Sequence, residues 1–215
     1  MSSIAIIDYG MGNLHSIAKA IEHVAGSERV LVSSDHQAIL AADRVVFPGV
    51  GAVRDCIAEL RRTGLDEVIV RVIESRPLLG VCLGLQALFD RSEENDGTEC
   101  LGILPGSVVR FPDDLADGSG GALLKIPHMG WNRVIPVREH VMWTGIPSGS
   151  RFYFVHSYHA VPARQDDVAA TTEYGLEFAS VVAHDNLFAV QFHPEKSQHA
   201  GLQLLANFVA WNGET

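Results

Sequence analysis

Near the start of the chain, a continuous apolar run is followed by apolar residues at helical spacing, which indicates two secondary-structure elements. Residues 4–8 form a short apolar run, and between positions 14 and 24 apolar residues recur every three or four residues. Glycines separate the two segments. Asn13 is suited to cap the first turn of the helix, and Gly26 can adopt the left-handed conformation that ends one. The pattern predicts a strand, a tight loop and a helix.

The same alternation continues to about residue 89. The run 77–81 is uniformly apolar, which is typical of a strand whose two sheet faces are both covered by helices. Strands alternating with helices indicate a parallel sheet. The pattern predicts further strands at 29–32, 44–47 and 77–81, a short helix beginning near Ser34 or Asp35, and helical segments over 53–74 and 85–89.

Beyond Cys100 the chain becomes rich in strands joined by short turns, some of them antiparallel. The pattern predicts strands at 108–111, 133–137, 151–159, 168–174 and 178–192. The acidic, glycine-rich stretch 112–121 is typical of an exposed loop. A last helix is expected over 198–212, with Ser197 as its cap. We therefore predict an α/β fold with a mostly parallel central sheet, flanking helices and a β-rich C-terminal part.

Composition limits which partners and which cellular compartment are expected. The 215 residues carry a formal charge of −10, and no cluster of Lys and Arg suits a polyanion, so nucleic acid is not expected. The N-terminus lacks the pattern of a secretory signal, and no apolar run approaches the roughly 18 residues that span a bilayer. We expect one cytoplasmic domain over residues 1–215, with no membrane association.

Candidate chemistry begins at Cys82, in the segment GVCLGLQ between the apolar run 77–81 and a predicted helix. Glycines two residues away on each side give the spacing of a nucleophile elbow with sulfur in place of oxygen. A helix N-terminus offers amides and partial positive charge, which favour a thiolate. The alternative is a structural cysteine buried in a tight turn.

A second motif, QFHPE, supplies a base and its orienting group. His193 and Glu195 lie two residues apart at the end of a predicted strand, so the histidine can accept the thiol proton while the carboxylate holds its ring. Alone, His193 is one of ten histidines and fits a surface loop better than it fits a base. Together with Cys82 it indicates a nucleophile and base pair.

The turn 48–51, with sequence PGVG, is a candidate third part. Backbone free of large side chains can aim the amide of Val50 at a developing oxyanion, together with the amide of Leu83. The alternative is an ordinary turn between strand and helix. Phosphate binding is less suited, because the P-loop lysine is absent.

Taken together, the segments GVCLGLQ, QFHPE and FPGVGA resemble the class I glutamine amidotransferases over essentially the whole chain. The resemblance implies a flavodoxin-like α/β fold and a catalytic triad of Cys82, His193 and Glu195. It also implies that the thiolate attacks the glutamine side-chain amide, that His193 protonates the departing ammonia, and that water then hydrolyses a glutamyl thioester.

Three further segments are similar to the glutaminase subunit of imidazole glycerol phosphate synthase: DYGMGNLHSI, PHMGWN and YFVHSYH. This resemblance implies a heterodimer with a (β/α)8 cyclase subunit, which uses the ammonia in histidine biosynthesis. It implies glutamine contacts at Gly51, Gln86, Ser157 and Tyr158. It also implies an interface at Asn13, Trp131, Tyr153 and Lys196, although these four also suit a helix cap, two core aromatics and a solvated charge.

No metal or organic cofactor is expected. Cys56 falls within an apolar helical pattern and Cys100 has no base beside it, so both are predicted to be structural. His156, His159 and His184 have no carboxylates at metal-ligand spacing.

Several alternatives remain open at this point. They are an amidotransferase subunit for another acceptor pathway, a catalytically silent binding subunit of the same fold, and a cysteine peptidase-like hydrolase. We also expect the PGVG turn to form the oxyanion site only when an occupied cyclase is docked.

Overall fold

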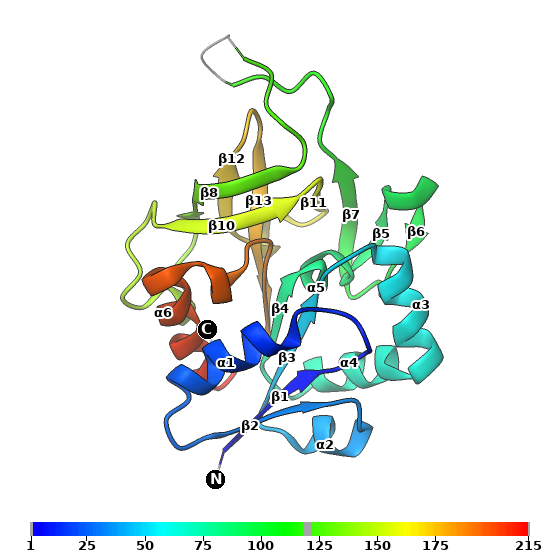
Figure 1. The fold of residues 1–215 in the computed structure, drawn as a ribbon, viewed down its shortest axis with the longest axis vertical. Helices are drawn as coiled ribbons and strands as arrows, with labels where there is room; N and C mark the ends of the chain where they lie inside the picture. The colour runs from blue at the N-terminus through cyan, green and yellow to red at the C-terminus, as the bar shows by residue number, and fades with distance from the viewer. Residues whose placement is uncertain (1, 118–121, 215) are drawn as a thin grey trace.

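The computed structural model describes residues 2–117 and 122–214, and one part of its large sheet is built on parallel strands (Figure 1). Strand order in this part of the sheet is β2-β1-β3-β4-β14, and all four pairings are parallel. Its strands are β1 (Ser3–Ile7), β2 (Arg29–Ser33), β3 (Arg44–Gly49), β4 (Leu78–Cys82) and β14 (Leu187–Val190). The C-terminal ends of β3, β4 and β14 therefore share one edge, where ligands bind in open parallel sheets.

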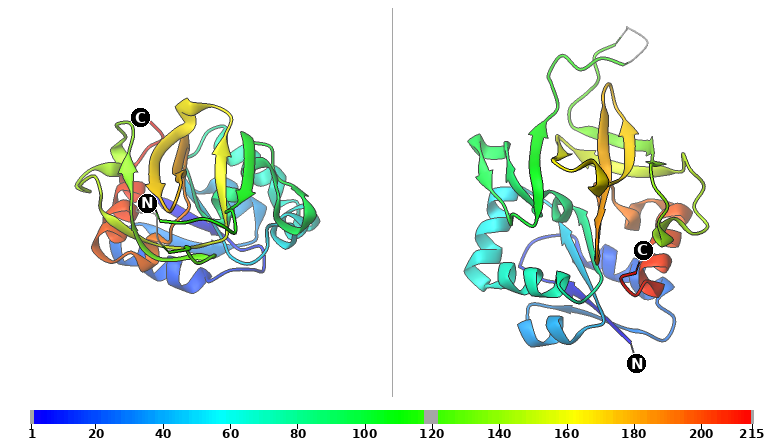
Figure 2. Two further views of the ribbon diagram at one scale, coloured as in Figure 1. Left: turned by 90° about the horizontal axis from the view of Figure 1, so that it is seen from above. Right: turned by 180° about the vertical axis from the view of Figure 1, so that it is seen from behind.

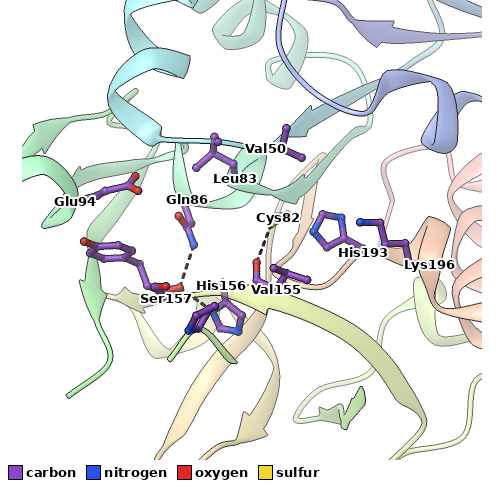
Figure 3. A pocket seen from close by; sticks show the side chains of 13 residues that line it. Val50, Cys82, Leu83, Gln86, Glu94, Val155, His156, Ser157, His193 and Lys196 are labelled. Atoms are coloured by element: carbon purple, nitrogen blue, oxygen red, sulfur yellow. Dashed lines mark hydrogen bonds between the residues drawn. The ribbon is translucent and has the colours of Figure 1, made fainter. Parts of the chain in front are cut away.

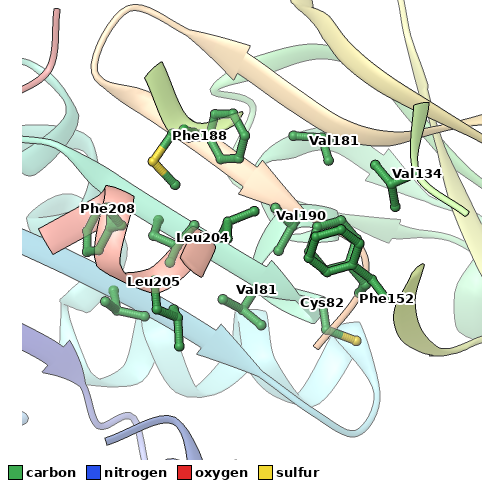
Figure 4. Close-up of a cluster of buried hydrophobic side chains, with 14 of the residues drawn as sticks. Val81, Cys82, Val134, Phe152, Val181, Phe188, Val190, Leu204, Leu205 and Phe208 are labelled. Atoms are coloured by element: carbon green, nitrogen blue, oxygen red, sulfur yellow. The ribbon is translucent and has the colours of Figure 1, made fainter. Parts of the chain in front are cut away.

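Helices cover both faces of this sheet, as the uniformly apolar strands predict. Along β1, Ile4 and Ile6 face one core, whereas Ala5 and Ile7 face the other. The first core lies under α1 (Leu14–Val24) and α6 (Gln198–Ala210), and Figure 4 shows Leu204, Leu205 and Phe208 of α6 against strand residues Val81 and Val190. The second lies under α2 (His36–Ala41), α3 (Val53–Thr63) and α4 (Leu65–Ile73).

Two predicted helical segments need correction. The pattern over 53–74 is two helices, because Gly64 has φ 71° and divides α3 from α4. The segment 85–89 was also wrong as a helix. A single turn, α5 (Leu83–Gln86), follows Cys82, and Phe89 already begins strand β5 (Phe89–Ser92). The other helices begin and end close to the predicted residues, with Asn13 accepting a hydrogen bond from the Ser16 amide and Asp35 one from the Ala38 amide.

A second part of the same sheet has mainly antiparallel strands, in the order β14-β13-β11-β7-β5-β6. Its members besides β5 are β6 (Thr98–Glu99), β7 (Leu104–Arg110), β9 (Ile135–Pro136), β11 (Tyr158–Pro162), β12 (Val168–Glu173) and β13 (Glu177–His184). A separate two-stranded sheet pairs β8 (His128–Arg133) with β10 (Arg151–His156), and it crosses in front of β11, β12 and β13 in Figure 1. The fold is therefore mixed α/β, as predicted.

Two long predicted strands are each two strands. Residues 151–159 divide at Ser157 into β10 and β11, which belong to different sheets. Residues 178–192 divide at the turn after His184, so that β13 and β14 pair antiparallel. Periodicity alone does not separate a long strand from a tight hairpin when both arms are apolar.

Single turns of 3-10 helix fill several connections: η1 (Glu94–Asp96), η2 (Val141–Trp143), η3 (Gln165–Asp167) and η4 (Pro194–Lys196). Figure 2 shows the chain from two further sides, with α6 near the C-terminus. Within residues 2–117 and 122–214, no helix has both the length and the apolar composition for crossing a membrane. The predicted loop 112–121 lies partly outside the described residues, at positions 118–121.

Ser197 stands at the N-cap position of α6, but the prediction that it caps this helix was wrong. Its hydroxyl donates to the carbonyl of His193 at 2.6 Å and accepts from the amide of Tyr153 at 3.0 Å. The side chain therefore ties the segment after β14 to β10 instead of satisfying a helix amide.

Candidate active site

Cys82 occupies the turn between β4 and α5 with an unusual backbone conformation. Its φ is 55° and its ψ is −108°, values that side-chain-bearing residues rarely adopt. Such strain persists only where the surroundings fix it, and it is common at functional sites. The residue is 7% exposed. The positive φ at the cysteine itself, between a buried strand and a helical turn, is the geometry of a nucleophile elbow.

The two glycines that flank Cys82 are required by neighbouring strands. A Cβ at Gly84 would lie 2.1 Å from the carbonyl oxygen of Phe47, and one at Gly80 would lie 2.9 Å from the Cβ of Ala189. Neither glycine needs a positive φ, since the unusual torsion belongs to Cys82. Their function is close approach of β3 and β14 to the elbow.

His193 and Glu195 follow β14, whose parallel partner β4 ends at Cys82. Pro194 lies between them and begins the η4 turn, which brings both side chains to the same side. The His193 Nδ1 lies 2.9 Å from Glu195 Oε1, and the two side chains are 7% and 5% exposed. Within the described part of the chain, Glu195 Oε2 has no hydrogen-bond partner. The histidine is therefore oriented by a buried carboxylate, as the motif predicted.

The electrostatics favour a charged imidazole at His193. Burial lowers the pKa of His193, but hydrogen bonding and charge interaction with Cys82 and Glu195 outweigh it and raise the pKa to about 10. A histidine that holds its proton beside a thiol favours the ionised form of that thiol. The pair is suited to deliver a thiolate nucleophile.

These residues open into a cavity of about 370 Å³ at the edge where β3, β4 and β14 end (Figure 3). In this view Cys82 lies between Gln86 and His193. Glu195 is the one member of the predicted triad outside the lining. The residues predicted from sequence that line the cavity are Val50, Gly51, Cys82, Leu83, Gln86, Ser157, Tyr158, His193 and Lys196.

The backbone beside the nucleophile brings Val50 and Leu83 together. Gly49 pairs with Cys82 across β3 and β4, so the next residue on each strand is Val50 and Leu83. The approach is close, since a Cβ at Gly49 would lie 2.7 Å from the Cβ of Leu83. Gly51, with φ 90°, continues the turn. The two predicted oxyanion amides therefore belong to adjacent residues at the cavity wall.

Gln86 is held by protein partners on its nitrogen side. Its Nε2 donates to the carbonyl of Tyr158 and to Oε1 of Gln191, both at 3.0 Å. Both amide hydrogens are thus used within the protein, which leaves Oε1 as its group for a ligand. A ligand at Gln86 is therefore expected to donate a hydrogen bond.

Of the four residues predicted for a partner interface, only Lys196 lines this cavity. Asn13 caps α1 on the exposed surface. The rings of Trp131 and Tyr153 contact each other across β8 and β10 with centroids 5.9 Å apart, and Trp131 is 42% exposed. This exposure does not fit a core aromatic.

Glu94, Val155 and Gln191 were missed as site residues. Glu94 lines the cavity, and its carboxylate accepts from the Val53 amide at 2.7 Å, so it also caps α3. In sequence it stands in a polar stretch typical of a solvated loop. The Cys82 sulfur lies 3.9 Å from the carbonyl of Val155, a main-chain contact that no side-chain pattern reveals. Gln191 belongs to the QFHPE motif, which was the available signal.

A second group of buried histidines reaches the cavity at His156, which lines it, and continues to His128. His156 Nδ1 lies 2.8 Å from the Tyr158 carbonyl and must donate to it, so His156 Nε2 accepts from His128 Nδ1 at 2.9 Å. His128 Nε2 then accepts from Asn132 Nδ2 at 3.3 Å. Burial lowers the pKa of His128 to about 4 and that of His156 to about 3. Both rings are therefore neutral at pH 7.

Among the residues that the structure describes, no three His, Cys, Asp or Glu side chains meet as metal ligands. Burial raises the pKa of the Cys56 thiol to about 12 and that of the Cys100 thiol to about 11. Their thiols are therefore neutral at pH 7, and neither lines the cavity described above.

Comparison with known proteins identifies the family. The sequence profile of the class-I glutamine amidotransferases matches residues 5–211. The chain is 61% identical to the imidazole glycerol phosphate synthase subunit HisH of Nitrosococcus oceani, over 99% of each chain. It is 60% identical to that of Methylococcus capsulatus, over 98% of this chain and 97% of the relative, and 57% identical to subunit HisH 1 of Pseudomonas aeruginosa, over 99% of each.

Solved structures agree on the fold. A putative GMP synthase component from Thermoplasma acidophilum superimposes with a TM-score of 0.69 at 20% identity, covering 98% of this chain and 93% of the other. A structure described as a glutamine amidotransferase gives a TM-score of 0.70 at 16% identity, covering 96% and 99%. The chain therefore belongs to the class-I glutamine amidotransferases and, within them, to the family of the imidazole glycerol phosphate synthase subunit HisH.

Proposed function

We propose that this protein hydrolyses glutamine to glutamate and ammonia and supplies the ammonia to the cyclase subunit of imidazole glycerol phosphate synthase, in histidine biosynthesis. The observation that carries the proposal is the meeting of a strained elbow cysteine with a carboxylate-oriented histidine at one cavity. The HisH relatives, matched over nearly their whole length, support the same role. The protein acts in the cytoplasm as one domain.

The first chemical step uses Cys82 and His193. The imidazole takes the thiol proton, and the sulfur attacks the side-chain carbonyl carbon of glutamine. The negative charge that develops on the carbonyl oxygen is met by the amides of Val50 and Leu83, a type of contact worth about 3 to 4 kcal/mol of barrier per donor. His193 then gives its proton to the leaving nitrogen, and ammonia departs.

The second step releases glutamate. His193, neutral again, removes a proton from water, which attacks the thioester carbon at the same face of the cavity. The carbon–sulfur bond breaks, and the sulfur leaves as thiolate. Glu195 keeps the Nδ1–H in place through both steps, so that Nε2 remains the nitrogen that exchanges protons with the reacting atoms.

Recognition of the amino-acid end of glutamine follows from the charges and polar groups that line the cavity. Glu94 can neutralise the α-ammonium group, and Gln86 Oε1 can accept one of its hydrogens. The main chain at Gly51, Ser157 and Tyr158 supplies the remaining polar contacts. In Figure 3, Glu94 and Lys196 lie at opposite ends of the view, with Cys82 between them.

The partner surface is proposed to include Asn13, Trp131, Tyr153 and Lys196. Trp131 and Tyr153 present an aromatic pair on the exposed side of the β8–β10 sheet, and aromatic residues are enriched in protein interfaces. Lys196 is exposed and lines the cavity wall, so it is proposed to join this surface to the cavity. Ammonia produced at Cys82 would then leave beside the partner.

Glutamate production tests the proposal. The protein is assayed alone, with a (β/α)8 cyclase subunit, and with that subunit plus its ribulosyl substrate or product. We expect activity that rises on addition of the loaded cyclase and is abolished by Cys82→Ala. A variant of the exposed helix residue Gln37, Gln37→Leu, is the matched control and should behave like the wild type.

The remaining outcomes separate the alternatives. Activity that ignores this cyclase keeps the triad and points to a different acceptor enzyme. Equal rates with and without the loaded cyclase contradict an oxyanion site that forms only on docking. Absence of glutamate in every mixture contradicts the proposed function and favours a silent binding subunit.

A further inference from the structure

Gln191 is a fully buried amide, 0% exposed, between the end of β14 and the catalytic histidine. Its backbone amide donates to the Ser180 carbonyl at 2.9 Å, which continues the pairing with β13. Burying a primary amide is costly unless its donors and acceptor find partners. The partners of the Gln191 side-chain amide therefore bear on the function of this residue beside Cys82.

The orientation of this amide is fixed by a chain of partners that begins at the main chain. The Tyr158 carbonyl can only accept, so the Gln86 atom that faces it must be nitrogen. The second hydrogen of that nitrogen points to Gln191, so the Gln191 atom in contact with it must be oxygen. The Gln191 nitrogen then faces the Cys82 sulfur at 3.8 Å.

The sulfur thus has two different neighbours besides His193. The Val155 carbonyl, at 3.9 Å, can accept from a thiol but offers nothing favourable to a thiolate. The Gln191 N–H donates to the sulfur, and a hydrogen bond to an ionised acceptor is roughly twice as strong as one to a neutral acceptor. Loss of the thiol proton therefore weakens the contact with the Val155 carbonyl and strengthens the hydrogen bond from Gln191.

We propose that Gln191 donates a hydrogen bond that stabilises the Cys82 thiolate, and that Gln86 fixes the donor in this orientation from the Tyr158 carbonyl. The inference rests on the proposed function, because it assigns a further residue to the same nucleophile. It also gives Gln86 a structural task on its nitrogen side, separate from substrate contact through its oxygen.

The test is the pH dependence of Cys82 alkylation by iodoacetamide in the full chain, followed by peptide mass spectrometry. Gln191→Met keeps the volume but removes the donor, and Gln191→Glu keeps an acceptor for Gln86 but places oxygen beside the sulfur. We expect the midpoint of alkylation to move to higher pH, by about one pH unit in Gln191→Met and more in Gln191→Glu. Gln37→Leu is the control.

Other ionisable groups that face the cysteine are the same in every variant and contribute a common background. These groups are His193 with Glu195 behind it, Tyr9, and, across the cavity, His156, Lys196 and Glu94.

The buried Cys56 and Cys100 report whether a variant is folded, because their thiols become alkylated if the structure is disrupted.

Glutaminase assays with the cyclase give a second readout. At pH 7, kcat of Gln191→Met should fall about 10-fold with little change in KM, and raising the pH should restore it. An unchanged midpoint in a folded variant overturns the inference while leaving the triad intact. If the wild-type protein shows no glutaminase activity but the alkylation midpoint still moves to higher pH in the variants, the proposed function is wrong. The contact between Gln191 and the thiolate is then supported.

The wild-type protein also provides a test without substitution. The side-chain amide protons of Gln191, followed by NMR, should shift with the same midpoint as Cys82 alkylation. Resonances that stay constant through that midpoint overturn the inference even if every variant unfolds.

Discussion

Two buried histidine sites meet at one cavity, which both His193 and His156 line, and their protonation differs. His193 carries its proton with a pKa raised to about 10, whereas burial lowers the pKa of His128 to about 4 and that of His156 to about 3. All three side chains are less than one-tenth exposed. Burial is therefore common to both sites, and the difference comes from their neighbours.

The neighbours of His193 are the Cys82 sulfur and the Glu195 carboxylate, and the negative charge that each group can carry stabilises the imidazolium. The neighbours of His128 and His156 are a carbonyl, an amide nitrogen and aromatic rings, including the stacked Tyr174, and each of these is neutral. One site is arranged to exchange protons and the other to hold one fixed set of tautomers. A buried histidine is therefore a candidate base only together with a charged partner.

The largest expected effect comes from removing the carboxylate beside His193. Glu195→Gln keeps the shape but removes the charge, so the imidazolium loses its stabilisation and kcat for glutamine hydrolysis should fall about 1,000-fold with KM nearly unchanged. Steady-state glutamate production with the loaded cyclase measures this. Glu74→Gln, at the exposed end of α4, is the matched control. A loss of less than 10-fold would falsify the orienting role of Glu195.

The next effect removes the thiol while the carboxylate remains. In Cys82→Ala the hydrogen bond and charge interaction from the sulfur disappear, so the pKa of His193 should fall from about 10 by at least one unit. Titration of the ring by heteronuclear NMR gives this value, with the exposed His23 as an internal control. A pKa that stays near 10 would show that Glu195 alone sustains the imidazolium.

The neutral histidines His128 and His156 should make the folded protein less stable in acid. An unfolded histidine binds a proton near pH 6.5, whereas His128 and His156 stay neutral down to about pH 4 and 3. The unfolded chain binds more protons in this window, so the free energy of unfolding decreases as the pH falls from 6.5 toward 4.

His128→Phe preserves the ring stacking and should remove about 2 kcal/mol of the stability difference between pH 7 and pH 5. Urea unfolding at the two pH values measures it. His199→Gln, on the exposed side of α6, is the control. The same pH dependence in His128→Phe and the wild type would assign the acid sensitivity to other groups, such as His140, whose pKa burial also lowers to about 4.

The smallest effect concerns the outer end of the histidine chain. Asn132→Ala leaves His128 Nε2 without its donor and also frees the Glu173 carbonyl, which should cost about 1 kcal/mol at pH 7. Glutaminase activity should stay within twofold of the wild type. Urea unfolding and the activity assay check the two statements, and a large drop in kcat would mean that the two histidine sites are coupled.

Much of the parallel half could be predicted from sequence, because its strands are short apolar runs and its helices have recognisable ends. Asp35 and Asn13 accept first-turn amides, as their residue types suggest. The single turn α5 was mistaken for a longer helix, since Phe89 is apolar at helical spacing although it forms a strand. The spacing of apolar residues along the chain does not determine which distant element a buried side chain will contact.

The location of the candidate site was predictable from the two motifs that contain Cys82 and His193. Cys82, His193 and the wall residues Gln86 and Ser157 lie around one cavity. The contacts through the main chain were not predictable, because the Val155 and Tyr158 carbonyls carry no signature in their side chains. Glu94 was missed for a related reason, since its cap on α3 spans residues that are distant in sequence.

The position of β14 has a consequence for how the molecule is made. This strand comes after β13 in sequence, yet it lies between β4 and β13 in the sheet, pairing Leu187 with Leu78. During synthesis the sheet therefore remains open in its middle until the chain is nearly complete, and pairings between such distant segments form slowly. A nascent chain that already carries Cys82 lacks β14 and therefore has no His193 beside its thiol, so the candidate site and the closed sheet are completed together.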